Sequence, residues 1–336
     1  MKFWDWVKEN LAWLIPAIIA VLTLLFGEGI WRGLKKKGQA ANTNQSGQAF
    51  IDPDKPNHSY EMGQAYYEQL KYKEAIEFFM KSAEEYEQQS GVSTLDRARA
   101  LNSAGLVLVD RAEYEKALER YIEARAIYGA KGGAKELASI FNNIAFVYWK
   151  QGRYDEALRW HRKALTMQEK KLGKKHTDTA VTYHNIARMY DVLGEYEEAL
   201  KWYFKALPIR EKKLGKEHPD TAWTYNNIAN VYANQGKYEE ALKWYFMALP
   251  IREKVLGKEN PDTAWTYNNI AIVYGDQKKF DDAFELYLKA YRIRLAKLGE
   301  EHPLTQQSRN NMRNTYDASG RTQFFDEWLN EQLADD

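Results

Sequence analysis

The sequence predicts an all-α solenoid of about six helix-turn-helix repeats and a C-terminal capping helix, preceded by a single transmembrane helix. Three observations predict this architecture. An uncharged apolar stretch near the N-terminus is long enough to cross a bilayer, and a 42-residue unit recurs through the remainder. No segment alternates polar and apolar residues at the period of two that a strand requires. The expected regions are an anchor, a flexible linker, the solenoid and a capping helix, at residues 1–37, 38–57, 58–320 and 321–336.

The N-terminal segment has the features of a membrane span. Residues 10–27 contain no charged side chain, and residues 11–31 would extend about 31 Å as a helix, close to the thickness of the hydrocarbon core. Tryptophans stand at both ends of the segment, as in an aromatic belt. Because Arg32 and Lys35–Lys37 follow it, the positive-inside rule predicts a single-pass membrane protein with its N-terminus outside and its repeats in the cytoplasm.

Two other interpretations of this segment are disfavoured. A cleaved signal peptide has a basic start and a small-residue cleavage site, whereas this chain begins with mixed charge and continues into lysines. A buried core helix of this length rarely lacks charge. Glu28, flanked by Gly27 and Gly29, either reaches the interface or contributes to a polar ring where several spans associate.

The rest of the chain is one repeated unit. The 42 residues from Thr182 return at Thr224 with 32 identities, and again at Thr266. An earlier copy begins at Ile140, two looser copies lie around Gly63 and Gly105, and a partial copy contains Asn310, Asn311 and Tyr316.

Each unit is predicted to form two helices. In the Thr224 copy, Tyr225, Ile228, Ala229 and Tyr232 lie on one helical face. Gly236 ends that helix, and Gly257 ends the second one. Pro261-Asp262-Thr263 begins the next unit, with Asp or Thr expected as its N-cap. Pro208 and Pro250 fall inside second helices, which they are expected to bend or break.

The alternation of small and aromatic residues resembles the tetratricopeptide repeat. In the Thr224 copy the pattern consists of Ala229, Tyr232, Gly236, Tyr238, Ala241, Tyr245 and Ala248. The 42-residue period and the stretch IREK-x-LGKE-x-PDTA are similar to the kinesin-light-chain class of these repeats, over residues 58–320. The resemblance implies a right-handed superhelix whose first helices line a concave groove. A motor role is not expected, because the kinesin-binding coiled coil is absent and a membrane span is present.

The resemblance also indicates where a peptide would bind. A polar pair recurs on each first helix, and in similar repeats the second asparagine binds the backbone of an extended peptide. An amide side chain suits this role because it offers both donors and an acceptor. The alternative is that these residues join neighbouring repeats. The predicted groove residues are the pair members His184, Asn226 and Asn268; the second asparagines Asn143, Asn185, Asn227, Asn269 and Asn311; the variable Arg188 and Asn230; and the aromatic Trp223 and Trp265.

Composition excludes several classes of function. With 48 basic and 47 acidic side chains the net charge is +1, unlike that of a dedicated nucleic-acid binder. The absence of cysteine excludes disulfides, thiolate metal sites and cysteine nucleophiles. His176, His218 and His302 share a loop position that Asn260 also occupies, so a structural role is expected there rather than metal binding. With no nucleophile–base constellation, neither an enzyme nor a cofactor is predicted.

The leading hypothesis is a membrane-anchored scaffold that binds a protein or peptide partner in its groove. The alternative is a sensor–effector of the bacterial defence type, in which the repeats detect a signal and associated spans perturb the membrane. Homo-oligomerisation is compatible with either hypothesis.

Overall fold

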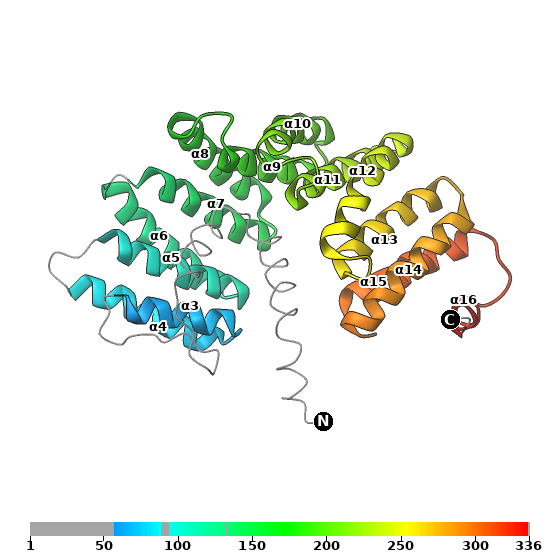
Figure 1. Cartoon of the computed structure of the whole chain (residues 1–336), viewed down its shortest axis with the longest axis horizontal. Coiled ribbons are helices and arrows are strands. Elements are labelled where there is room, and N and C mark those ends of the chain that lie inside the picture. Colours follow the sequence, from blue (N-terminus) through cyan, green and yellow to red (C-terminus); the bar gives the residue numbers. More distant parts are fainter. Residues whose placement is uncertain (1–56, 89–93, 132, 335–336) are drawn as a thin grey trace, which may run out of the picture. The chain divides into compact units, whose positions relative to one another are not determined.

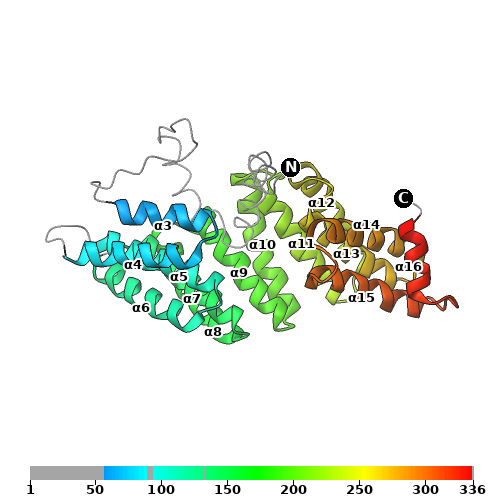
Figure 2. The same cartoon turned by 90° about the horizontal axis from the view of Figure 1, so that it is seen from below.

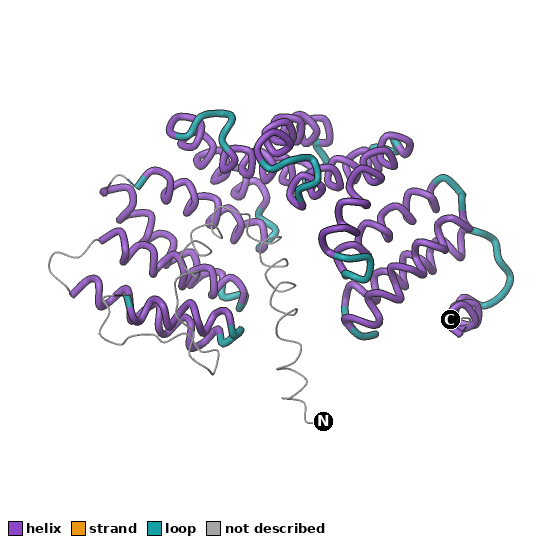
Figure 3. Tube along the Cα trace, in the orientation of Figure 1, coloured by secondary structure: helices purple, strands orange, loops and turns teal. Residues whose placement is uncertain are grey.

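The computed structural model describes residues 57–88, 94–131 and 133–334. This part of the chain is helical throughout and contains no strand (Figures 1 and 3), which confirms the all-α prediction for it. The residues divide into two compact units, the first ending at Gly194 and the second beginning at Glu195. The first unit contains α3 His58–Glu68, α4 Tyr72–Gln88, α5 Thr94–Asp110, α6 Tyr114–Lys131, α7 Ala134–Lys150, α8 Tyr154–Lys171 and α9 Thr177–Val192. The second contains α10 Tyr196–Lys213, α11 Pro219–Asn234, α12 Tyr238–Leu256, α13 Pro261–Asp276, α14 Phe280–Leu298, α15 Pro303–Ala318 and α16 Phe325–Ala334.

The predicted anchor and linker lie outside the described residues, as do Gly27, Glu28 and Gly29. Within the part of the chain that the structure describes, no helix combines the length and apolar character needed to cross a membrane.

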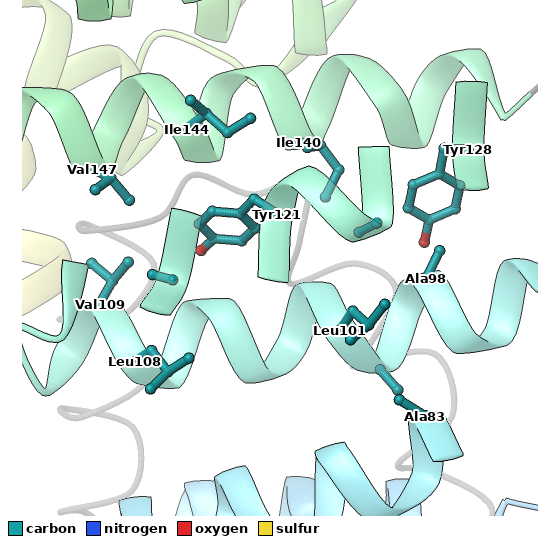
Figure 4. Close-up of a cluster of buried hydrophobic side chains, with 13 residues drawn as sticks. Ala83, Ala98, Leu101, Leu108, Val109, Tyr121, Tyr128, Ile140, Ile144 and Val147 are labelled. Atoms are coloured by element: carbon teal, nitrogen blue, oxygen red, sulfur yellow. The ribbon is translucent and has the colours of Figure 1, made fainter. Parts of the chain in front are cut away.

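The core of the first unit lies between successive helices that pack side by side. Tyr121 of α6 is fully buried and points between α5 and α7, next to Leu108, Val109 and Ile144 (Figure 4). A β-carbon at Gly105 of α5 would lie 2.5 Å from Cε1 of this ring. The small residue is therefore required where the tyrosine crosses the neighbouring helix, as the sequence pattern predicts.

The second unit ends in a short helix that covers the last repeat. Trp328 of α16 lies 5.0 Å from the Phe284 ring of α14 and 4.9 Å from the Tyr316 ring of α15. Figure 2 shows α16 beside α14 at the C-terminal end of the array. Aromatic contacts of this kind add to the apolar burial that stabilises the last unit of a solenoid.

The N-cap of each later first helix lies two or three residues before the Asp or Thr that the sequence indicated. Nδ1 of His218 accepts a hydrogen bond from the Asp220 amide at 3.1 Å. Asn260 Oδ1 accepts one from Asp262 in the same way at 2.8 Å. The expectation of Asp or Thr as the cap was wrong, because the Asp supplies the backbone donor. The hydroxyl of Thr263 instead donates to the Gly257 carbonyl at 2.9 Å. His176 and His302 cap α9 and α15.

The two helix-interior prolines do not break their helices. α10 continues through Pro208, and α12 continues through Pro250. Each proline removes the amide donor to the carbonyl four residues earlier, that of Phe204 or Phe246. Both prolines are exposed, so water can satisfy those carbonyls.

His161 of α8 is a buried titratable group in the first unit. Its Nδ1 lies 2.8 Å from Asn142 Oδ1, and because an amide oxygen only accepts, Nδ1 carries the proton. Burial first, and then the positive charge of Arg188, lower the pKa of His161 to about 3. At this position four other repeats carry buried tyrosines, such as Tyr203 and Tyr245, and the first carries Phe79.

We expect Gly105→Ala to destabilise the chain by about 1–3 kcal/mol, because the new methyl group meets the buried Tyr121 ring. Gly129→Ala in α6 is the matched control, since a β-carbon there has no neighbour within 4 Å. It should stabilise α6 by about 0.5–1 kcal/mol. Urea unfolding followed by circular dichroism measures both, and equal effects would contradict the ring-against-glycine contact.

Substitutions of the capping residue should show that its side-chain acceptor stabilises the helix. We expect His218→Ala to cost about 1 kcal/mol, because it removes the acceptor for the Asp220 amide. His218→Asn should cost much less, since Asn260 makes the same bond in the next repeat. Thermal unfolding of the two variants tests this, and a His218→Asn variant as unstable as His218→Ala would argue against a capping role.

The stability of the first unit should depend on pH through His161. Its folded pKa lies below the unfolded value of about 6.5, so the unfolded chain binds the extra proton and stability falls as pH drops below 6.5. The loss should be about 2 kcal/mol by pH 5. His161→Tyr, which restores the residue of most other repeats, should remove this part of the slope. Unfolding free energies at several pH values measure the difference, and parallel slopes would disprove it.

Candidate peptide-binding face of the first helices

In the first unit the asparagine pair of α7 bonds to both neighbouring repeats. Asn143 Nδ2 donates to Asn102 Oδ1 of α5 at 2.8 Å. Asn142 Nδ2 donates to Thr182 Oγ1 of α9 at 2.9 Å. These bonds join successive first helices in a row, and they are of the kind expected if the asparagines tie repeats together.

Asn185 of α9 differs from the other pairs. It is half-buried, and its amide makes no hydrogen bond with any described residue. One turn away, the guanidinium of Arg188 lies 4.8 Å from the centre of the Trp149 ring of α7. Phe146 stacks against Trp149 at 5.4 Å, and Lys150 lies 5.3 Å from the same ring. The face therefore carries on α9 an amide that bonds to no described residue and, one turn further along, an arginine that lies over an aromatic cluster.

In the second unit the pairs form a similar row. Thr266 Oγ1 donates to Asn226 Oδ1 at 3.0 Å. Asn269 Nδ2 of α13 donates to Asn230 Oδ1 of α11, also at 3.0 Å. Asn311 of α15 donates to Asn268 at 3.4 Å. Neighbouring first helices are thus joined here as well.

Burial divides the predicted groove residues into two groups. His184, Asn226 and Asn268 are at most 2% exposed and belong to the interior, where a peptide on the surface does not reach them. Asn143 and Asn227 retain only 9% and 5% exposure. The predicted residues that a peptide could contact are therefore the half-buried ones on this face: Asn185, Arg188, Asn230, Asn269 and Asn311.

The two predicted aromatic anchors contact each other. The rings of Trp223 and Trp265 stack at 5.5 Å between α11 and α13. The guanidinium of Arg252 lies over both, 5.0 and 5.7 Å from their centres. Both tryptophans remain half-buried, so one part of each ring is engaged in packing between repeats.

Three buried arginines, which recur every 42 residues, are not among the predicted site residues. Nη1 of Arg210 donates to the Asp220 carbonyl and to Thr224 Oγ1, each at 2.8 Å. Arg252 and Arg294 repeat both bonds with the residues ten and fourteen positions further on. Burial lowers the pKa of Arg252 and of Arg294 to about 10, so both remain charged at neutral pH. They fix the start of the next first helix and hence the position of its asparagine pair.

Comparison with solved structures supports the fold. BtubC (BKLC) from P. vanneervenii superposes with a TM-score of 0.61 and 24% identity, over 69% of this chain and 94% of that one. The STAND protein with a tetratricopeptide repeat sensor, PH0952 from Pyrococcus horikoshii, gives a TM-score of 0.63 at 15% identity, over 80% of this chain and 40% of that protein. At these identities the likeness concerns the fold alone.

Sequence comparison adds a relative and a family. Protein KINESIN LIGHT CHAIN-RELATED 1 of Arabidopsis thaliana is 29% identical over 119 residues, which are 35% of this chain but only 20% of the plant protein. The tetratricopeptide repeat model matches residues 56–130, 136–212, 192–254, 220–296 and 262–324. Since these matches cover nearly all of the array of paired helices, the chain belongs to the tetratricopeptide repeat family.

Proposed function

We propose that this protein is a membrane-tethered scaffold that holds an extended segment of a protein partner against the first helices of its repeats. The observation that carries this proposal is Asn185, whose amide makes no bond to a described residue while the equivalent Asn143 and Asn269 are bonded to adjacent repeats. A half-buried amide without a partner has a donor and an acceptor available for a peptide backbone. Trp149 and Arg188 lie close by and offer side-chain contacts that vary between repeats.

The proposed membrane tether is supported by the amino-acid sequence. The uncharged stretch at residues 10–27 and the basic residues after it favour a single-pass anchor with the repeats on the cytoplasmic side. A scaffold at the membrane raises the local concentration of whatever it binds. The sensor–effector alternative uses the same parts but requires the spans to associate and make the bilayer leak.

The peptide face can be tested without knowing the partner. A phage-displayed library of random peptides is selected on the full chain in detergent, and the enriched peptides are titrated against variants. Asn185→Ala should weaken binding about tenfold, the equivalent of about 1.4 kcal/mol for a lost pair of backbone hydrogen bonds. Asn330→Ala, at an exposed position of α16, is the control and should leave binding unchanged. Enriched peptides that bind Asn185→Ala as tightly as the parent would refute the proposed face.

Loss of dye from vesicles separates the two classes of function. A scaffold should insert into vesicles without releasing an entrapped dye. Release that depends on residues 1–37 would support the sensor–effector alternative.

A further inference from the structure

The second unit has an exposed apolar ridge on its second helices. Phe204 of α10 is 40% exposed, and Phe246 and Met247 of α12 are 48% and 45% exposed. The Phe204 ring lies 5.8 Å from Trp244 of the adjacent second helix, so the apolar surface continues from one helix to the next. We call these three exposed residues the outer ridge.

Only some copies of the repeat carry apolar residues at these positions. The residues equivalent to Phe204 and to its neighbour Lys205 in α8 are Arg162 and Lys163, and both are exposed. In α14 the residue equivalent to Met247 is the exposed Lys289. Leu288, equivalent to Phe246, is 92% buried by its own surroundings. Between 40% and 48% of each ridge side chain is thus exposed to water as apolar area, which points to a surface that covers it.

Positive charge lies on the same side of α10 and α12. Lys201, Lys205 and Lys243 are exposed, and Lys201 precedes Lys205 by one helical turn. Lys205 Nζ lies 3.8 Å from the centre of the Trp202 ring. Lys201 forms an ion pair with Glu198 at 2.9 Å, so Lys205 and Lys243 carry the positive charge beside the ridge. Aromatic and aliphatic side chains flanked by lysines are the composition of surfaces that lie in the headgroup region of a bilayer.

We propose that the outer ridge rests on the surface of a bilayer containing anionic phospholipids. This inference depends on the tether proposed above. The predicted anchor would keep the chain at the bilayer and so raise the local concentration of lipid headgroups around the ridge. Each exposed lysine near an anionic leaflet is attracted to it, and the ridge side chains then enter the interface.

The prolines limit the depth of insertion. Pro208 and Pro250 leave the carbonyls of Phe204 and Phe246 without a helical donor, and these carbonyls need water or a lipid headgroup. The ridge therefore lies at the level of the headgroups, where both are present, and does not enter the hydrocarbon core.

The chain contains no cysteine, so a single engineered thiol can report on one position. The full chain carrying Met247→Cys is labelled with an environment-sensitive dye and placed in phosphatidylcholine nanodiscs, with or without phosphatidylglycerol. Headgroup nitroxide lipids should quench this dye roughly twofold more strongly when phosphatidylglycerol is present. A dye at Asn310→Cys, on the exposed side of a first helix, should not respond.

Adding Phe204→Gln and Phe246→Gln should abolish the quenching at position 247. Ile122→Gln on α6 is the matched control, because Ile122 is 49% exposed but lies outside the ridge, and it should leave the quenching intact. Flotation with phosphatidylcholine vesicles is measured first. A chain that fails to float refutes the tether. A chain that floats but shows equal, weak quenching at positions 247 and 310 refutes the ridge proposal alone. If the dye is not quenched and mass photometry instead shows dimers that depend on the ridge residues, the proposal is also overturned, because a second copy of the chain then covers the ridge.

Discussion

The contact between a large ring, a tyrosine in most repeats, and a residue with almost no side chain determines how paired helices pack. Tyr121 against Gly105 shows the constraint most directly, because even a methyl group would overlap the ring. In later repeats an alanine such as Ala229 takes the place of the glycine and is completely buried. Since each unit of a solenoid contacts only its neighbours, this local fit, repeated along the chain, replaces the single large core of a globular domain.

Hydrogen bonds between repeats fix the orientation of each repeat relative to the next. Arg252 reaches the first turn of the following helix, while Asn226 accepts a bond from Thr266 of the next copy. Apolar packing tolerates small rotations, whereas a buried guanidinium bound to a carbonyl and a hydroxyl does not, because leaving it unpaired is costly. The asparagines on the first helices thus support the array as well as forming its candidate binding face.

Local patterns were enough to predict the paired helices, the glycine turns and the need for small residues, because each of these depends on a few neighbouring positions. The burial of Asn226 and Asn268 was not predictable, since it depends on contacts between residues about 40 positions apart. The caps were assigned two or three positions late, because Asp and Thr are commoner caps and both follow the capping residue in sequence. The exposure of Phe204 and Phe246 was not predictable either, because aromatic residues in a helical pattern are usually in the core.

Hydrogen bonds between residues at a fixed sequence spacing limit how such a chain can gain or lose length. An arginine bonds ten and fourteen residues ahead, and an asparagine about forty residues ahead or behind, so every partner belongs to the same or the adjacent copy. Inserting or deleting one entire copy regenerates the same pairs at the new junction. Inserting part of a copy leaves buried donors unmatched. The two adjacent copies that begin at Thr182 and Thr224, with 32 of 42 residues identical, are what recent duplication of a whole unit would produce.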